Sequence, residues 1–369
     1  MTTDQIYSLV NQVSAQALGQ QALTATDAAS LVSLGNVVLN STSNTEAFLN
    51  TLAQRIGRTI MSFRQYRNRL RDMVLNDFEY GAILQKIAVQ MPEAKPDPTY
   101  SLVNGVSIDP WEVSKPEAVQ KLFAKRTPYM FHITIQEETL REAFLSESGM
   151  ASFIGIVMGE VRNAIEIALE NLGRATIANY IAEVNGTARM IDLSTAFTAA
   201  GYTSAASLQN PEFLRFVIQT INNTIDMLQE STILYNDGTK PRFTPKEDMR
   251  IKLSSNFIRA AETVTEYAAF NQQFIETDGV YDKMTFWQSA QTPDSILVNR
   301  ASDSAETNVS GLIGVIYDRD ALGIYQQRER IATTPVNARG LYYNQFWHER
   351  QLWFNDLSEN FVAFVIGGE

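Results

Sequence analysis

A proline-rich stretch between residues 91 and 128 restricts the fold of this chain more than any other segment. It holds six of the eleven prolines, and each proline fixes φ and removes a backbone donor. The stretch is therefore predicted to be extended, non-helical chain. Its apolar residues, among them Tyr100, Val106 and Trp111, alternate with polar ones, which makes it too apolar for a linker. We expect a long hairpin arm that packs on another surface.

The overall composition is that of an ordinary globular protein. The 369 residues are 45% hydrophobic and 19% charged, which favours two or three folded domains. The sequence has no apolar run long enough to span a membrane, and its first residues do not resemble a secretory signal. The formal net charge of −11 argues against a protein that reads nucleic-acid sequence, but it permits a surface that lines a DNA-filled space.

Helical spacing of apolar residues predicts helices along much of the chain. The first 75 residues are expected to be helical, with Ser43 and Glu46 forming a capping box for the third segment. Asn210 is expected to cap a helix that starts at Pro211. Further helices are predicted at 137–145, 150–184 and about 256–270. In the long helix, the glycines at positions 155, 159 and 173 are expected either to permit close approach of another element or to mark bends.

Alternating and continuous apolar runs predict strands in the rest of the chain. Between the helices, a turn is expected at residues 236–238. Together these patterns indicate an α+β protein. The predicted strands cover residues 129–135, 249–253, 280–287, 295–299, 312–317, 341–354 and 361–366.

An arginine cluster between residues 55 and 71 departs from the acidic character of the whole chain. If the segment is helical, Arg64, Arg67 and Arg71 share one face. They could contact phosphates or an acidic partner, or they could form a solvated face that pairs with nearby carboxylates. The solvated face is the commoner outcome for a run of charge.

The sequence contains no recognisable catalytic, metal or cofactor site. Cysteine is absent and there are only two histidines, which disfavours thiol chemistry and histidine-based sites. Phosphate-binding and hydrolase motifs are also absent. His348 and Glu349 are neighbours on a predicted strand, so their side chains point to opposite faces. The acidic pair in Asp318-Arg319-Asp320 is interpreted as part of a turn.

Three stretches resemble the major capsid proteins of short-tailed, double-stranded-DNA phages, particularly small phages with protein-primed replication. The first is residues 131–144, a strand followed by a short helix, and the second is the long helix at 150–184. The third comprises residues 317–344, which include an Arg-Gly-Leu-Tyr run at 339–342, together with the apolar strand 361–365. The resemblance implies the Hong Kong 97 phage-type capsid fold.

That fold implies a division of the chain into regions. A helical N-terminal arm that crosses to neighbouring subunits would cover residues 1–84, and an extended E-loop hairpin would cover 85–136. The peripheral domain would comprise residues 137–186, with the spine helix, and the C-terminal strands at 321–369. Residues 187–320 would form the axial domain.

The resemblance also implies a function and partners. We expect a non-enzymatic major capsid protein without cofactors that self-assembles, as pentamers and hexamers, into an icosahedral shell. Packaged double-stranded DNA, bound without sequence reading, is an expected partner, as are a scaffolding protein and a portal. Assembly is expected in the host cytoplasm, and no membrane partner is expected. Two alternatives remain at this point: an encapsulin-type compartment that encloses enzyme cargo, and a soluble enzyme with a carboxylate site.

Overall fold

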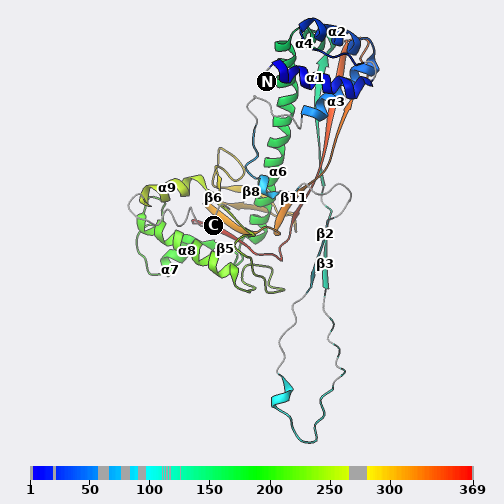
Figure 1. Cartoon of the computed structure of the whole chain (residues 1–369). Helices are drawn as coiled ribbons and strands as arrows, with labels where there is room; N and C mark the ends of the chain where they lie inside the picture. Colours follow the sequence, from blue (N-terminus) through cyan, green and yellow to red (C-terminus); the bar gives the residue numbers. More distant parts are fainter. Residues whose placement is uncertain are drawn as a thin grey trace.

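The computed structural model describes residues 3–19, 22–56, 66–75, 84–89, 97–109, 111, 113, 115, 118–124, 126–265 and 281–367. A long helix, α6 (Glu160–Val184), connects its two ends. Figure 1 shows a cluster of helices at one end of α6, sheets and further helices at the other end, and a hairpin that projects away from both.

Three N-terminal helices confirm the helical prediction for the start of the chain. They are α1 (Thr3–Leu18), α2 (Ala28–Leu39) and α3 (Thr42–Ile56). The carboxylate of Asp27 caps α2 by accepting the Ser30 amide at 2.8 Å. The predicted capping box at Ser43 is wrong, because α3 already begins at Thr42, before the predicted cap. The amide of Thr45 already donates to the carbonyl of Ser41 at 3.0 Å, so Ser43 lies within the first turn.

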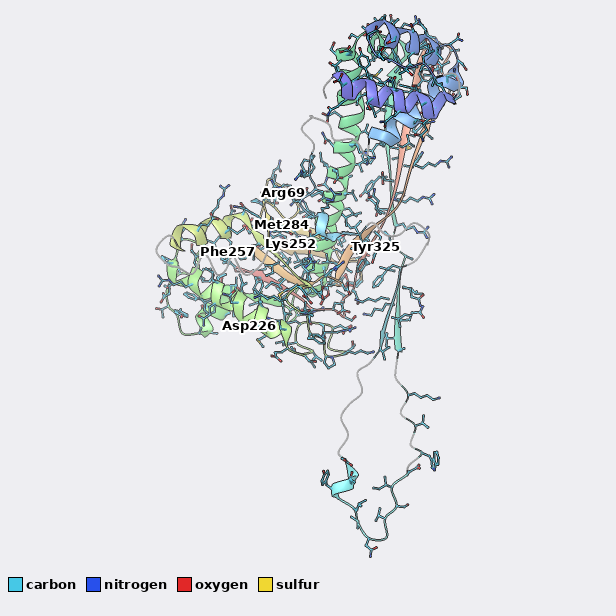
Figure 2. The ribbon with its side chains drawn as sticks, in the orientation of Figure 1. Arg69, Asp226, Lys252, Phe257, Met284 and Tyr325 are labelled. Atoms are coloured by element: carbon cyan, nitrogen blue, oxygen red, sulfur yellow. The ribbon has the colours of Figure 1, made fainter. Side chains whose placement is uncertain are left out.

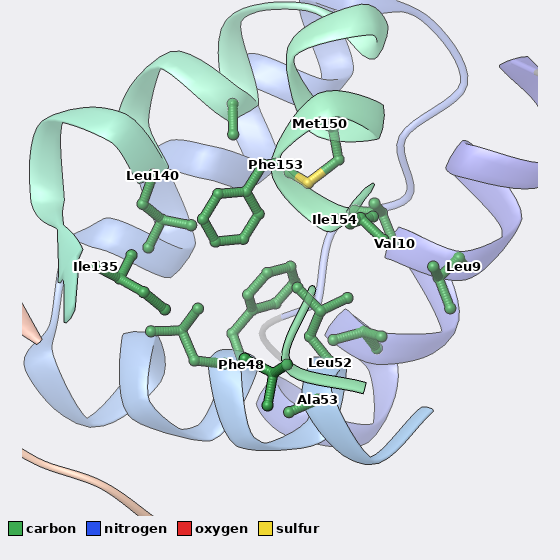
Figure 3. Close-up of a cluster of buried hydrophobic side chains, with 14 of the residues drawn as sticks. Leu9, Val10, Phe48, Leu52, Ala53, Ile135, Leu140, Met150, Phe153 and Ile154 are labelled. Carbon is green, nitrogen blue, oxygen red and sulfur yellow. The ribbon is translucent and has the colours of Figure 1, made fainter. Parts of the chain in front are cut away.

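The apolar stripes of these helices are buried inside the same chain. They pack on α4 (Glu137–Leu145) and on α5 (Glu147–Phe153). Figure 3 shows Phe48 and Leu52 of α3 facing Leu140 and Phe153 across one interior. A Cβ atom on Gly35 of α2 would lie 2.6 Å from the Cβ atom of Phe144, so only glycine permits this approach of α2 to α4.

Residues 66–75 are not helical, which contradicts the prediction for the end of this region. They form a stretch without regular secondary structure that ends in a turn, then a 3₁₀ turn η2 (Arg71–Met73) and the short strand β1 (Val74–Leu75). We call residues 66–73 the crossing segment, because it lies across α6. The Glu170 carboxylate of α6 accepts the Tyr66 hydroxyl at 2.7 Å and the Arg69 amide at 3.1 Å. These bonds to a distant helix replace the intrahelical bonds that the local pattern predicted.

Close approach explains one of the three glycines in the long helix. A Cβ atom on Gly173 would lie 3.0 Å from a methyl carbon of Leu70 in the crossing segment. The other two glycines lie in or at the end of a π-helical turn, η4 (Ile154–Gly159), which separates α5 from α6. The predicted long helix is therefore helical throughout, but it begins at Glu147 and is interrupted by a turn of different pitch.

A four-stranded sheet lies beside α6. Its order is β1, β11 (Leu322–Thr333), β12 (Tyr342–Asn355) and β4 (Arg126–Gln136), with β12 antiparallel to both long neighbours. The predicted strands at 129–135 and 341–354 are confirmed. His348 is exposed and Glu349 is buried, so their side chains point to opposite faces as expected.

A five-stranded sheet is the centre of the part of the protein at the other end of α6 from the N-terminal helices. Its order is β5 (Met190–Asp192), β13 (Phe361–Val365), β10 (Leu312–Asp318), β6 (Met249–Ser254) and β7 (Tyr281–Met284). All five residues of β13 are buried, because elements cover both faces of the sheet. Val362 and Phe364 pack toward the helices α7 (Leu193–Ala199), α8 (Pro211–Gln229) and α9 (Ser255–Thr265). Phe361 and Ala363 pack toward α6.

The helix α8 begins as predicted. The Asn210 side chain accepts the Glu212 amide at 3.0 Å, and Pro211 occupies the first helical position.

A separate two-stranded sheet, β8 (Ile296–Asn299) with β9 (Glu306–Val309), packs near α6. The turn at residues 236–238 is also confirmed, since Gly238 has a φ of 78°.

A buried lysine connects the crossing segment to the five-stranded sheet. The Lys252 side chain of β6 is fully buried, and its Nζ atom lies 2.6 Å from Asp72 and also contacts Asp282 of β7. Figure 2 labels Lys252 in this inner position. Because an unpaired buried ammonium would be costly, the two carboxylates hold their segments against β6.

Candidate interaction surface

The hairpin that Figure 1 shows projecting from the protein starts from two paired strands. These are β2 (Leu84–Val89) and β3 (Ala118–Phe123), antiparallel, with Leu84 opposite Phe123 and Val89 opposite Ala118. The predicted hairpin end at residue 136 needs correction. The ladder ends at Phe123, and residues 126–136 form β4 because they pair with β12 instead.

The loop beyond these strands contains a 3₁₀ turn, η3 (Pro98–Tyr100), and a tight turn from Val103 to Val106. The Val106 amide donates to the Val103 carbonyl at 3.1 Å. Gly105 has a φ of 86°, a value that the third position of such a turn requires and that glycine adopts without strain. The chain reverses direction at this point.

The loop carries large apolar side chains that the described part of the chain leaves exposed. Tyr100 is 94% exposed, Trp111 84% and Val106 66%. The side chains drawn on the loop in Figure 2 lie away from the rest of the protein. Soluble monomers seldom leave so much apolar surface together in water, and aromatic residues dominate protein–protein contacts. The other exposed apolar residues of this loop are Leu102, Val103, Ile108 and Val113.

The strands at the root of the hairpin are tied to the body by a group of charges. Lys86 and Lys121 lie directly opposite each other in the ladder, an arrangement that is repulsive by itself. The buried carboxylate of Asp356 lies between them, 2.9 Å from Lys86 Nζ and 2.8 Å from Lys121 Nζ. Lys86 also lies 2.7 Å from Glu359. The residues just after β12 therefore hold both strands of the hairpin.

The same contacts keep Asp356 ionised. Burial opposes the charged form, but the hydrogen bond from Lys121 and the charge of Lys86 outweigh it and lower the pKa of Asp356 to about 2. Burial also opposes the charge on Lys86, yet Glu359 and Asp356 raise its pKa above the ordinary value. The root of the hairpin is thus a charged anchor at neutral pH.

The arginine cluster does not form the predicted helical face. Arg67 and Arg71 are exposed on the crossing segment, Arg67 in chain without regular secondary structure and Arg71 in η2. The helix is absent because Glu170 binds this part of the chain to α6, as described above. Arg64 lies outside the described residues.

The remaining chemical candidates have structural explanations. Asp318 ends β10 and accepts the Asp320 amide at 2.8 Å, so the predicted turn is confirmed. His132 is exposed and stacks on Phe346, with ring centroids 4.7 Å apart. In the part of the chain that the structure describes, no group of acidic or histidine side chains could hold a metal ion. The same part holds no helix that is long and apolar enough to cross a membrane.

The structure thus consists of a long central helix, a helical cluster at one of its ends, a five-stranded sheet with its helices at the other, and an apolar hairpin loop. A family model described as "Phi29-like phage major capsid protein" matches residues 10–365 of this sequence. The chain belongs to this family. Its members are structural proteins, which excludes the alternative of a soluble enzyme and confirms the prediction that the chain is not an enzyme.

Curated relatives in the family are similar over most of the chain. The major capsid protein of Bacillus phage B103 is 24% identical over 346 residues, which cover 90% of this chain and 66% of that protein. The major capsid protein of Bacillus phage PZA is 23% identical over 332 residues, with the same two coverages. The chain spans about two thirds of the length of these relatives.

Solved structures show the same fold at much lower identity. A chain from the capsid structure of Staphylococcus phage Andhra superimposes with a TM-score of 0.56 at 10% identity, covering 84% of this chain and 87% of that one. A chain from a structure of native bacteriophage P68 gives 0.54 at 10% identity, with coverages of 83% and 86%. The predicted α+β, Hong Kong 97 phage-type capsid fold is confirmed.

The sequence pattern predicts the apolar loop but gives no indication of the charged anchor at its root. Lys86 and Lys121 each lie between apolar or neutral residues of a short segment, and this alternation is only a weak indication that the hairpin has a polar face. No local pattern links them to Asp356, because 235 residues separate Lys121 from this partner. Glu170 and its contacts to the crossing segment were missed for the same reason.

Proposed function

We propose that this Phi29-like major capsid protein self-assembles into an icosahedral shell that encloses a double-stranded DNA genome. The observation that carries the proposal is the loop at residues 97–113, which projects from a charged anchor and exposes its aromatic and aliphatic side chains. Burying Tyr100, Val106 and Trp111 on another copy would remove this surface from water. A repeated contact of one patch with a different patch closes into rings when the rotation between copies closes.

The family fold supports a division of labour within the shell. The body built on residues 187–320 would meet its copies around pentamers and hexamers. The regions 137–186 and 321–369 would form the peripheral domain, with α6 as the spine helix. The hairpin would contact a neighbouring subunit. Residues 1–84 would form the N-terminal region, whose first three helices are packed on their own chain.

The cargo and the further partners are part of the same proposal. The relatives are phage capsid proteins, which favours a packaged genome over the enzyme cargo of an encapsulin-type compartment. The net charge of −11 suits a wall that encloses DNA without reading its sequence. A scaffolding protein and a portal would take part in assembly, which would occur in the host cytoplasm before the protein resides in the virion.

Deletion of the loop tests whether the hairpin drives assembly. We expect a chain in which residues 91–116 are replaced by a short glycine-serine turn to remain folded but to form no shells. The measurement is negative-stain electron microscopy of the soluble fraction, after expression alone and with scaffolding protein. A control replaces Tyr100, Val106 and Trp111 by serine within a loop of native length. Shells at normal yield from either variant would refute the role of the hairpin.

Charge reversal tests the arginine cluster. Arg67 and Arg71 are exposed on the crossing segment, and Arg64 belongs to the same cluster in the sequence. If the three arginines contact an acidic patch of a neighbour, replacing them by glutamate should block assembly. If they contact the genome, empty shells should form normally and nuclease-protected DNA should fall. Normal shells with normal DNA content would leave the cluster as a solvated face.

A further inference from the structure

The hairpin loop holds one of the two Asn-Gly pairs in the sequence, at residues 104–105, and the other pair is at residues 185–186. Because glycine has no Cβ atom, its amide nitrogen is open to approach and the backbone around it rotates freely. These two properties favour attack of the glycine nitrogen on the side chain of the preceding asparagine, a residue that is thermolabile in proteins. Both pairs are exposed, so exposure does not distinguish them.

The two pairs have the same local geometry. In the turn at residues 103–106, the amide of the fourth residue donates to the carbonyl of the first at 3.1 Å, and Gly105 has a φ of 86°. The corresponding bond, also 3.1 Å, closes the turn at residues 184–187, where Gly186 has a φ of 74°. Each asparagine thus occupies the second position of a turn whose third position favours glycine. A difference in reactivity between them must come from what surrounds each turn.

The turn at residues 184–187 is held at both ends by the rest of the protein. Val184 is fully buried, and the Asn185 amide donates back to a carbonyl of α6 at 3.4 Å. The Thr187 hydroxyl donates to the Val184 carbonyl at 2.7 Å. The Thr187 carbonyl accepts the amide of Met190, the first residue of β5, at 3.1 Å. Rotation of the backbone in this turn therefore disturbs both α6 and β5.

The turn at residues 103–106 has no comparable support. Its two terminal valines are 65% and 66% exposed. Among the described residues, the bond that closes the turn is the one backbone hydrogen bond that it makes. Only this bond has to break before the Asn104 backbone can rotate and bring its side chain against the Gly105 nitrogen. Such weakly bonded loop segments open at low cost in free energy.

We propose that Asn104 is the preferred deamidation site of the unassembled protein and that its conversion removes a subunit from assembly. The Gly105 nitrogen loses its proton to solvent and attacks the side-chain carbonyl carbon of Asn104, which closes a succinimide ring and releases ammonia. Water then opens the ring at either carbonyl and leaves aspartate or isoaspartate. The product places a carboxylate among the exposed apolar side chains of Leu102, Val103 and Val106.

The effect on assembly rests on the proposed function of the loop. A loop that buries its apolar side chains on another copy would have to remove the new carboxylate from water as well, and an unpaired buried charge is costly. Isoaspartate also lengthens the backbone at the point where the chain reverses direction. We therefore expect shells to exclude converted subunits.

The first test is peptide mapping by mass spectrometry of the full-length chain, kept too dilute to assemble and incubated in mildly alkaline buffer. We expect Asn104 to convert at least about tenfold faster than Asn185, since conversion of Asn185 also breaks the hydrogen bonds that hold its turn. In urea, which removes the fold, the two sites should convert at similar rates. Equal rates in the folded chain, or a difference that persists in urea, would overturn the proposal.

The second test is the yield of shells from fresh and aged subunits, counted by negative-stain electron microscopy. The matched control is Asn104→Gln, which keeps a side-chain amide but has an extra methylene that disfavours ring closure. The aged native chain should lose yield in proportion to its converted fraction, whereas aged Asn104→Gln should keep its yield. Equal yields from the two aged proteins would contradict the effect on assembly. Because the conversion rates are measured without shells, they decide the deamidation site even if fresh subunits fail to assemble.

Discussion

The N-terminal helices and the hairpin loop are both rich in apolar residues, but the chain treats them differently. Val10, Leu34 and Phe48 of the helices are fully buried against α4 and α5. Tyr100 and Trp111 of the loop are almost fully exposed. From the sequence, the N-terminal helices were expected to cross to neighbouring subunits and the hairpin to pack on another surface. In the structure the helices complete the interior of their own subunit, whereas the loop leaves its large apolar side chains exposed.

The largest effect on stability is expected inside the helical cluster. Replacing Phe48 by alanine removes a fully buried ring that packs on Phe144, with ring centroids 5.3 Å apart. We expect a loss of about 3–5 kcal/mol in the free energy of unfolding, measured by urea denaturation of the unassembled chain. A loss below about 1 kcal/mol would mean that the helices are not part of the subunit interior.

An intermediate effect is expected at the anchor of the hairpin. The pKa of Asp356 is lowered from 3.8 to about 2 in the folded protein, so its contribution to stability is complete above the unfolded pKa. That contribution, about 2 kcal/mol, is lost as the pH falls from about 4 through about 2. Stability curves of the native chain and of Asp356→Asn should therefore converge in this window.

A matched substitution makes the pH measurement specific. Asp226 is exposed on α8, and Asp226→Asn should leave the difference between neutral and acidic stability close to that of the native chain. If Asp356→Asn shows the native pH dependence as well, the anchor does not depend on that carboxylate.

The smallest effect on stability is expected in the loop. Because Trp111 is 84% exposed, Trp111→Ala should change the free energy of unfolding by less than about 0.5 kcal/mol. The same substitution should reduce the yield of shells, since buried aromatic anchors contribute much of the energy of an interface. Parallel measurements of urea denaturation and particle yield separate the two effects. A stability loss comparable to that of Phe48→Ala would remove the contrast between the two regions.

Elements with strong local signals could be predicted closely. Asn210 and Pro211 define the start of α8 through their own backbone and side-chain preferences. The alternation at residues 129–135 and the continuous run at 361–366 likewise identify β4 and β13. In contrast, the pattern did not predict β11, whose middle reads Gln-Gln-Arg-Glu-Arg. Its pairing with β1 and β12 outweighs its weak local preference for a strand.

The sequence by itself determined the fold class, the positions of most helices and strands, and the apolar character of the hairpin loop. These features depend on residue type and short-range spacing. Only the tertiary structure decided that residues 66–73 pack on α6 without forming an α-helix and that Lys86, Lys121 and Asp356 meet at the root of the hairpin. It also decided which apolar stripes are covered by their own subunit. These features depend on contacts between segments far apart in the chain, whose geometry no local pattern specifies.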